Sequence, residues 1–208
     1  GTELWYAGLP QYDRWTPAVD DSLAYAYVGD YSPGLYAIDR FTGVQAYYIP
    51  DNHFEWDGWS MNLAPVVGRH DDVIAIHDGR LISFDITRRS IRWQLQRNFQ
   101  GQPSVAQDRI YAIDGGRLVV LDEVSNTELW SWQPPEGNLT GPMIVTDTHL
   151  LGSTATNVYA VDIVTRQAVW SFPAAGLLAL ANNTLYIASS NGTLTAVNMP
   201  TYVPSPMV

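Results

Sequence analysis

The sequence predicts an all-β protein, a five-bladed β-propeller of four-stranded antiparallel blades. The first observation is a repeat in which a short apolar run ends in Asp or Asn. These residues lie 46, 37, 40 and 36 positions apart, at Asp39, Asp85, Asp122, Asp162 and Asn198. The second is that each period holds several short runs rich in Val, Ile, Leu and Tyr, bounded by Gly, Pro, Asn and Asp, as strands and turns are. Four-stranded units with a period near 40 residues indicate a propeller.

Each repeat is expected to supply its strands in the same order. In the first unit we expect strands at residues 17–19, 23–28, 35–38 and 44–48. In later units the first strand begins at Pro65, Pro103 and Pro142; proline cannot donate to a ladder and so suits the exposed edge of an innermost strand. The pairs Asp78-Gly79, Gly115-Gly116 and Asn191-Gly192 suit tight hairpins that need positive φ.

The two ends of the chain are expected to close the ring. Residues 3–6 match the last strand of a repeat, and the unit that ends near Asn198 lacks such a strand. We therefore expect residues 3–6 to pair antiparallel with residues 194–198, because closure removes an exposed sheet edge. Residues 1–199 would form one domain, and the proline-rich residues 200–208 an extended tail. A start at Gly1 within a strand leads us to expect a processed chain or an excised domain.

The repeat consensus Ala-x-Asp-x-x-Thr-Gly-x-x-x-Trp resembles that of pyrroloquinoline-quinone-type propellers. Residues 36–43 carry it best, with Tyr47 in place of Trp, and residues 159–170 carry Arg166 where Gly is usual. The resemblance implies that the repeated aromatics dock between blades, at Trp5, Tyr47, Trp93, Trp130 and Trp170. The chain lacks the vicinal Cys pair of many quinone-dependent members. It is closer to the non-enzymatic branch, which includes the periplasmic lipoprotein of the outer-membrane protein assembly machinery.

Composition narrows the classes of partner. The 208 residues carry a formal net charge of −10, every basic residue is Arg or His, and there is no Cys. Phosphate binding needs a basic stripe, so we expect neither a nucleic-acid partner nor binding to an anionic membrane surface. Disulfides and Cys chemistry are excluded. No apolar run is long enough to span a membrane.

The repeated and scattered polar residues are predicted to be structural. An Asp at the end of every third strand is expected to cap the following turn through its side-chain oxygen, whereas a catalytic group would occur once. The His residues lie at non-equivalent repeat positions, and their spacing does not resemble a zinc motif. We therefore expect no catalytic residue, no metal site and no cofactor.

One non-repetitive stretch is the candidate binding site. Residues 49–61 make the first repeat spacing the longest, and residues 51–59 within them are the candidate, because long loops on a rigid scaffold often carry function. The stretch gathers aromatics and carboxylates that suit a protein interface or a sugar face. The alternative is a loop that folds its aromatics onto the adjacent blade. The candidate binding residues are His53, Phe54, Glu55, Trp56, Asp57 and Trp59, with Trp15 expected near the channel mouth.

The sequence thus favours a non-catalytic scaffold that engages a protein partner through loops on one face, as a monomeric domain. The resemblance implies a periplasmic or extracellular location. Two alternatives stay open. One is a carbohydrate- or small-ligand-binding or enzyme-associated module that uses residues 51–59. The other is an extracellular sensor domain of a larger receptor.

Overall fold

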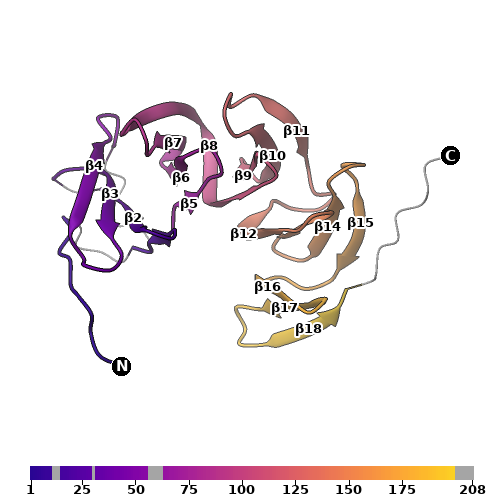
Figure 1. The fold of residues 1–208 in the computed structure, drawn as a ribbon. Helices are drawn as coiled ribbons and strands as arrows, with labels where there is room; N and C mark the ends of the chain where they lie inside the picture. The colour runs from indigo at the N-terminus through magenta and orange to yellow at the C-terminus, as the bar shows by residue number, and fades with distance from the viewer. Residues whose placement is uncertain (11–14, 30, 56–62, 200–208) are drawn as a thin grey trace.

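The protein is a row of antiparallel sheets arranged along an open arc (Figure 1). The computed structural model describes residues 1–10, 15–29, 31–55 and 63–199. These residues hold no helix, and therefore none that is long and apolar enough to cross a membrane. The all-β architecture predicted from the repeat is confirmed, and the tail at 200–208 lies outside the described residues.

The strands fall into five successive repeat units, here called units 1 to 5. Unit 1 comprises β1 (Ala18–Val19), β2 (Leu23–Val28), β3 (Gly34–Asp39) and β4 (Gln45–Pro50). Unit 2 comprises β5 (Val66–Val67), β6 (Asp72–His77), β7 (Gly79–Asp85) and the first part of β8 (Ser90–Ala106). Unit 3 takes the second part of β8, then β9 (Arg109–Asp114), β10 (Arg117–Asp122) and β11 (Glu128–Trp132). Unit 4 comprises β12 (Thr140–Val145), β13 (His149–Ser153), β14 (Val158–Asp162) and β15 (Ala168–Phe172), and unit 5 comprises β16 (Leu177–Ala181), β17 (Thr184–Ala188) and β18 (Leu194–Asn198).

Strand β8 joins units 2 and 3 into one seven-stranded sheet, where separate strands were expected. Its residues pair with β7 as far as Phe99 and with β9 from Phe99 onward, with register shifts on both sides. No proline or glycine interrupts the chain between Ser90 and Gln100, so the backbone stays extended through the junction. The other junctions carry Pro and Gly in their connections, at 134–137 and 173–176 for example.

The aspartates that end the third strands cap the next turn, as predicted. Asp39 Oδ1 accepts hydrogen bonds from the amides of Phe41 and Thr42. Asp122 and Asp162 each accept from the amides two and three residues further on. Four residues after the Asp, the backbone is left-handed at Gly43, Arg89, Asn126 and Arg166. The turn geometry is therefore kept even where the consensus glycine is replaced.

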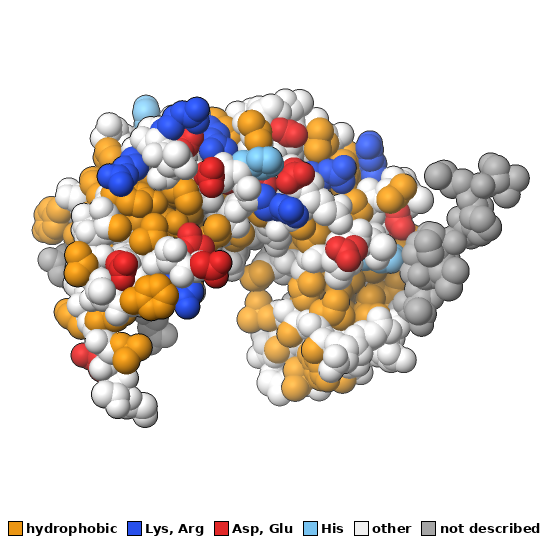
Figure 2. All heavy atoms as spheres, in the orientation of Figure 1, with side chains coloured by type: hydrophobic (Ala, Val, Ile, Leu, Met, Phe, Trp, Pro, Cys, Tyr) orange, Lys and Arg blue, Asp and Glu red, His pale blue; other side chains and the backbone are white. Residues whose placement is uncertain are grey.

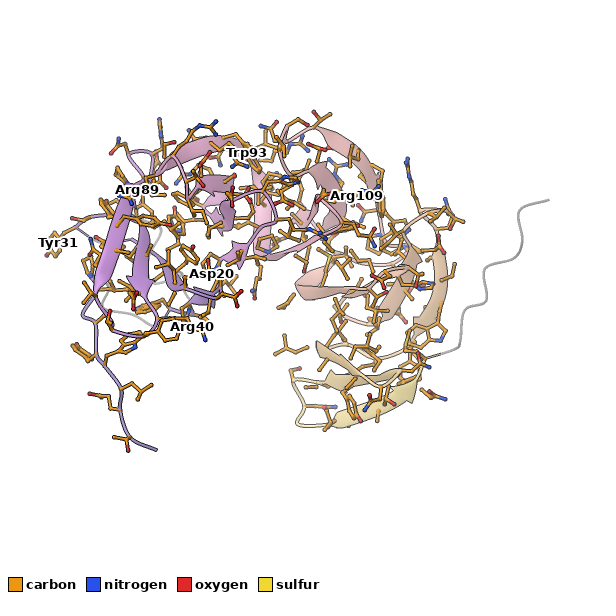
Figure 3. The ribbon with its side chains drawn as sticks, in the orientation of Figure 1. Asp20, Tyr31, Arg40, Arg89, Trp93 and Arg109 are labelled. Atoms are coloured by element: carbon orange, nitrogen blue, oxygen red, sulfur yellow. The ribbon has the colours of Figure 1, made fainter. Side chains whose placement is uncertain are left out.

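One hydrophobic core lies at each junction between neighbouring units, and a further one lies on the outer face of unit 1. The first core, for example, joins Tyr25 and Leu35 of unit 1 to Val73 and Phe84 of unit 2. The repeated aromatics dock there as expected: Tyr47, Trp93, Trp130 and Trp170 each pack in a different junction core. Trp93 belongs to β8 (labelled in Figure 3), and its indole N–H donates to the carbonyl of Glu123, in unit 3, at 3.2 Å.

The expected ring closure is not formed, and that prediction is wrong for this structure. Residues 3–6 are not in a strand, and β18 pairs with β17 alone among the described residues. Trp5 docks instead on unit 1, where its indole N–H donates to the Arg40 carbonyl at 2.9 Å, as Trp93 does on unit 3. Units 1 and 5 lie at opposite ends of the arc (Figure 1), so the segment cannot reach β18. Figure 2 shows hydrophobic side chains on the surface of unit 5. In this unit Leu177 and Leu194 are 63% and 67% exposed.

Candidate functional site

A buried ion pair anchors the start of the candidate loop to unit 2. The Asp51 carboxylate receives Arg80 through both oxygens, at 2.6 and 3.1 Å. Both side chains are nearly inaccessible to solvent. The Tyr27 hydroxyl donates to Asp51 at 2.7 Å, and Arg80 also donates to the Gln94 side chain at 3.0 Å. A bidentate guanidinium–carboxylate pair that also contacts Tyr27 and Gln94 fixes the loop in one geometry.

The electrostatics show which ionic state this anchor adopts. Burial raises the pKa of Asp51, but hydrogen bonds from Arg80 and Tyr27 outweigh burial and hold the pKa below its ordinary value. Burial, followed by the adjacent Asp51, raises the pKa of Tyr27. At neutral pH the anchor is therefore a carboxylate, a guanidinium and a neutral phenol. Such a pair is costly to break, because either partner alone would be a buried, uncompensated charge.

Phe54 turns inward and packs between units 1 and 2. Its ring stacks on His77 with the centroids 4.3 Å apart and the planes 6° from parallel. It lies so close to Gly29 that a Cβ there would come within 1.9 Å of the ring. The His77 ring nitrogen Nε2 lies 2.8 Å from the Glu55 carbonyl oxygen. Phe54 therefore holds the loop down, which is the alternative the sequence left open for the aromatics of this stretch.

The anchored loop borders a polar recess of about 490 Å³ at one end of units 1 and 2. Below, "the recess" means the depression lined by His53, Glu55, Asp78, Arg80, Gln94 and Gln96. The backbone carbonyl of Asp78 receives the Gln96 side-chain amide at 3.0 Å, which holds that side chain at the rim. His53 and Glu55 are exposed. The lining offers carboxylates, amides and an imidazole, groups that can exchange hydrogen bonds with a polypeptide or a sugar.

The predicted site residues separate in the structure. His53 and Glu55 line the recess, and Phe54 packs beneath it. Trp15 packs with Trp5 on the outer face of unit 1 and does not line the recess. Its position near a channel mouth stays a prediction. Trp56, Asp57 and Trp59 lie outside the described residues.

The recess also contains residues that the sequence reasoning missed. Asp78, Arg80, Gln94 and Gln96 come from β7, β8 and the turn before β7. One signal in the sequence could have indicated Arg80. It is a charged residue that lies between a hairpin turn and the mostly apolar residues 81–84. Its partner Asp51 lies 29 residues away, a separation at which no local pattern connects two residues.

A second groove, of about 450 Å³, lies between units 3 and 4, beside the turns that follow β8, β12 and β14. It is lined by Gln107, Arg109, Leu129, Trp130, Asp147, Ile163, Val164 and Arg166. Val164 is 80% exposed at its edge, and the Arg166 guanidinium lies 5.9 Å from the Trp130 ring centroid. This groove is more apolar than the recess, and the sequence analysis did not single it out.

The strand order, the capped turns and the docking aromatics define a propeller-type protein built from pyrroloquinoline-quinone-type repeats. The family profile PQQ_2, described as outer membrane protein assembly factor BamB, matches residues 77–201. That match covers more than half of the chain, and the chain belongs to this family. No curated protein sequence matches it.

Solved structures share the fold at low sequence identity. BamB from Moraxella catarrhalis superposes with a TM-score of 0.71 at 20% identity, over 90% of this chain and 59% of that one. The computationally designed Ika8 protein gives 0.68 at 14% identity, over 88% and 57%. The quinohemoprotein alcohol dehydrogenase ADHIIG from Pseudomonas putida HK5 gives 0.70 at 16% identity, over 92% and 41%. The present chain thus spans about three fifths or less of each of these structures.

Proposed function

We propose that this chain is a non-catalytic propeller scaffold that binds a protein partner through the end of units 1 and 2 that carries the recess. The observation that carries the proposal is the anchored loop. The buried Asp51–Arg80 pair and the Phe54–His77 stack fix its backbone, while His53 and Glu55 remain exposed beside the recess. A preorganised polar rim loses little entropy when a partner binds.

Membership in a family described as an outer membrane protein assembly factor supports this function. By the same reasoning the partner is a component of an envelope protein-assembly complex, and the location is periplasmic. We further propose that each repeat unit is one propeller blade and that residues 1–199 form one domain. The net charge of −10 favours partners other than nucleic acids.

The test is a binding measurement on the full 208-residue chain with a purified outer-membrane assembly complex that lacks its own propeller subunit. Glu55→Arg reverses a charge at the recess, and His53→Ala removes the imidazole. Both should weaken binding at least about tenfold if the recess forms the centre of the interface. Asp147→Asn, a change at an exposed turn between β12 and β13, is the matched control and should bind normally. Equal binding by all variants would place the interface elsewhere.

The non-catalytic part of the proposal has its own test, because a quinohemoprotein alcohol dehydrogenase shares the fold. The chain would be incubated with pyrroloquinoline quinone and calcium and assayed with a redox dye and a panel of alcohols and sugars. We expect no turnover above that of heat-denatured protein. Saturable turnover would overturn the scaffold assignment.

A glycan or small polar ligand is the second candidate, favoured by the amide-rich lining of the recess. Gln94 and Gln96 lie beside Glu55 and Arg80, and amides with charged groups suit sugar hydroxyls. Titration of a neutral oligosaccharide panel by NMR would test this candidate. Shifts confined to the Gln94 and Gln96 side-chain amides would favour the glycan over the protein partner.

A further inference from the structure

Two buried carboxylates meet between units 2 and 3, at the turn end that lies opposite the recess along the strands. Asp72 begins β6 and Glu123 follows β10, and both are fully inaccessible to solvent. Asp72 Oδ2 accepts from the Ser83 hydroxyl at 2.7 Å, and Glu123 Oε1 accepts from the backbone amides of Arg69 and His70. The second oxygens, Asp72 Oδ1 and Glu123 Oε2, have no hydrogen-bond partner among the described residues.

Glu123 departs from the repeat. The residue directly after the turn Asp or Asn is apolar in units 2, 4 and 5, and its amide donates to the turn between the first two strands in every unit. The equivalent residues are Arg40, Ile86, Ile163 and Met199. A carboxylate therefore occupies a buried position that hydrophobic side chains fill elsewhere in the same fold.

Asp72 departs from the repeat in the adjacent unit. It pairs with Asp85 across the β6–β7 ladder. The residues in the equivalent register in the other units are Leu23, Arg109, His149 and Thr184. Asp72 is thus the one carboxylate at this position, and it faces the unit whose Glu123 is also exceptional. Two exceptions at a single junction, side by side, indicate a built site.

Gly68 allows the carboxylates to approach the same piece of backbone. A Cβ at residue 68 would lie 2.0 Å from Asp72 Oδ1 and 2.6 Å from Glu123 Oε1. Any side chain would displace these oxygens. The glycine therefore leaves room for the unpartnered Asp72 Oδ1 beside Glu123.

Two more ligand-type groups complete the cluster from the solvent side. Three side chains, those of His70, Asp108 and Glu123, each offer one ligand atom. These three atoms all lie within 4.8 Å of one another. His70 Nε2 is 3.3 Å from Asp108 Oδ1, and the side chains are 40% and 63% exposed. The Arg69 Nε lies 3.5 Å from the same Asp108 oxygen, on a side chain that is 61% exposed and can move aside. The cluster is therefore open to solvent on one side and closed on the other.

Charge balance argues for a cation at this place. Two ionised carboxylates are acceptors only, so neither can satisfy the other. The nearest guanidinium, Arg92, lies 3.6 Å from the other Asp72 oxygen, Oδ2. Buried charge of this kind is ordinarily paired or coordinates a metal.

We propose that His70, Asp108 and Glu123 form a site for a divalent cation of the zinc class, with Asp72 as the adjacent carboxylate that stabilises it. One imidazole with carboxylate oxygens suits Zn²⁺ rather than Ca²⁺ or Mg²⁺, which prefer all-oxygen ligands. The ligands come from turns of units 2 and 3, so the ion would fasten one unit to the next. This site is independent of the proposed partner-binding function.

The test is calorimetric titration of the chelator-treated full chain with ZnCl2, and separately with CaCl2 and MgCl2. We expect one equivalent of zinc to bind and to raise the Tm, and calcium and magnesium to bind far more weakly. His70→Ala and Asp108→Asn should each weaken zinc binding at least about tenfold, since even second-shell changes cost that much. Glu123→Gln should do the same while its remaining oxygen still accepts from the Arg69 and His70 amides.

His149→Ala is the matched control, because His149 is also a turn histidine, at the repeat position that Asp72 occupies in unit 2. It should leave the zinc affinity unchanged. Loss of binding in His149→Ala but not in His70→Ala would overturn the site. Absence of saturable zinc binding, or calcium binding as tight as zinc binding, would also overturn the proposal. Since His70 and Asp108 are exposed, their variants should fold and keep the outcome readable.

Discussion

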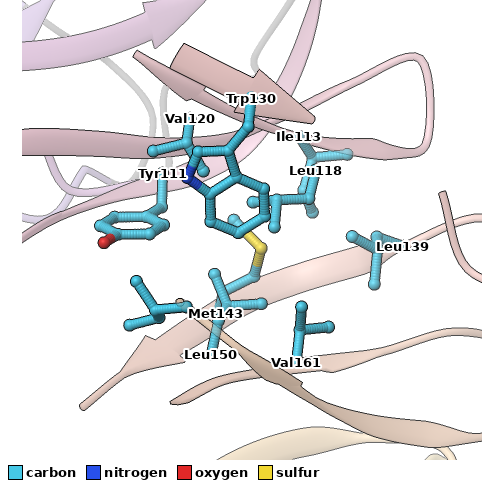
Figure 4. Close-up of a cluster of buried hydrophobic side chains, with 10 residues drawn as sticks. Tyr111, Ile113, Leu118, Val120, Trp130, Leu139, Met143, Leu150 and Val161 are labelled. Carbon is cyan, nitrogen blue, oxygen red and sulfur yellow. The ribbon is translucent and has the colours of Figure 1, made fainter. Parts of the chain in front are cut away.

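The junction between units 2 and 3 and the junction between units 3 and 4 share one mode of tryptophan docking and differ in chemistry. In both, a docking Trp packs against the residue that follows the turn Asp of the next unit. At the second junction that residue is Ile163, which belongs to a buried apolar cluster. Figure 4 shows Trp130 in this cluster, beside Met143. At the first it is Glu123, whose carbonyl accepts from Trp93 and whose side chain joins a polar cluster. The repeat therefore determines where neighbouring units contact each other, but it does not determine whether that contact is apolar or polar.

The largest effect should separate the two docking tryptophans. Trp130 is only 7% exposed within the apolar junction, so Trp130→Ala should lower the free energy of unfolding by about 3–5 kcal/mol. Trp93 is half-buried, and Trp93→Ala should cost less. Urea unfolding of both variants tests the ranking. An equal loss in both would show that the polar junction depends on its indole as strongly as the apolar one does.

The next effect concerns the acceptor at the polar junction. Glu123→Ala leaves the amides of Arg69 and His70 without their acceptor and should cost about 1–3 kcal/mol of stability. Ile163→Val at the apolar junction removes one methylene and should cost about 0.5–1.5 kcal/mol. Parallel thermal unfolding of the two variants measures the difference. A neutral Glu123→Ala would mean that water satisfies these amides.

Acid should affect the polar junction through Asp85, which holds Arg92 beside Asp72. Hydrogen bonds from the Arg88 amide and side chain lower the pKa of Asp85 to about 2, below its value in the unfolded chain, about 4. The linked stability is therefore fully present above about pH 4 and is lost as the pH falls toward about 2. Asp85→Asn should flatten this part of a curve of unfolding free energy against pH.

The smallest effect is expected at the recess, which lies away from both junctions. Glu55 is exposed, so Glu55→Ala should change the free energy of unfolding by no more than about 0.5 kcal/mol. Phe54→Ala should cost more, because its ring stacks on His77 between units 1 and 2. Chemical denaturation of both variants compares them. A large loss in Glu55→Ala would make the exposed rim part of the structural anchor.

The repeat pattern was sufficient to predict the units, because each unit forms the same strands and turns from the same types of residue. The strand at Leu23–Val28, the capping aspartates and the docking aromatics at Tyr47 through Trp170 are all found where the pattern places them. The hairpin at Asp78-Gly79 has positive φ at both residues. The repeat predicts these features because strands and turns depend on local sequence, namely on turn residues and on the alternation of apolar and polar side chains.

The open arc and the polar sites could not be predicted in this way. Closure depends on how far five units rotate along the arc, which no single repeat encodes. Asp51 and Arg80 meet across 29 residues, and His70, Asp108 and Glu123 come from three different turns. The useful signal was a departure from the repeat, a carboxylate where units 2, 4 and 5 carry Ile or Met. This departure can be recognised only when the units are aligned by strand register.

Strand β8 also determines which parts of the molecule open together. Its 17 residues pair with β7 as far as Phe99 and with β9 from Phe99 onward, with register shifts on both sides, whereas no other two units of the described chain share a strand. Units 2 and 3 should therefore form one cooperative unit in native-state hydrogen exchange, in which the amides of β6 to β11 share a single opening free energy. Unit 5, which has one neighbour, would exchange earlier, as the terminal element of a linear array.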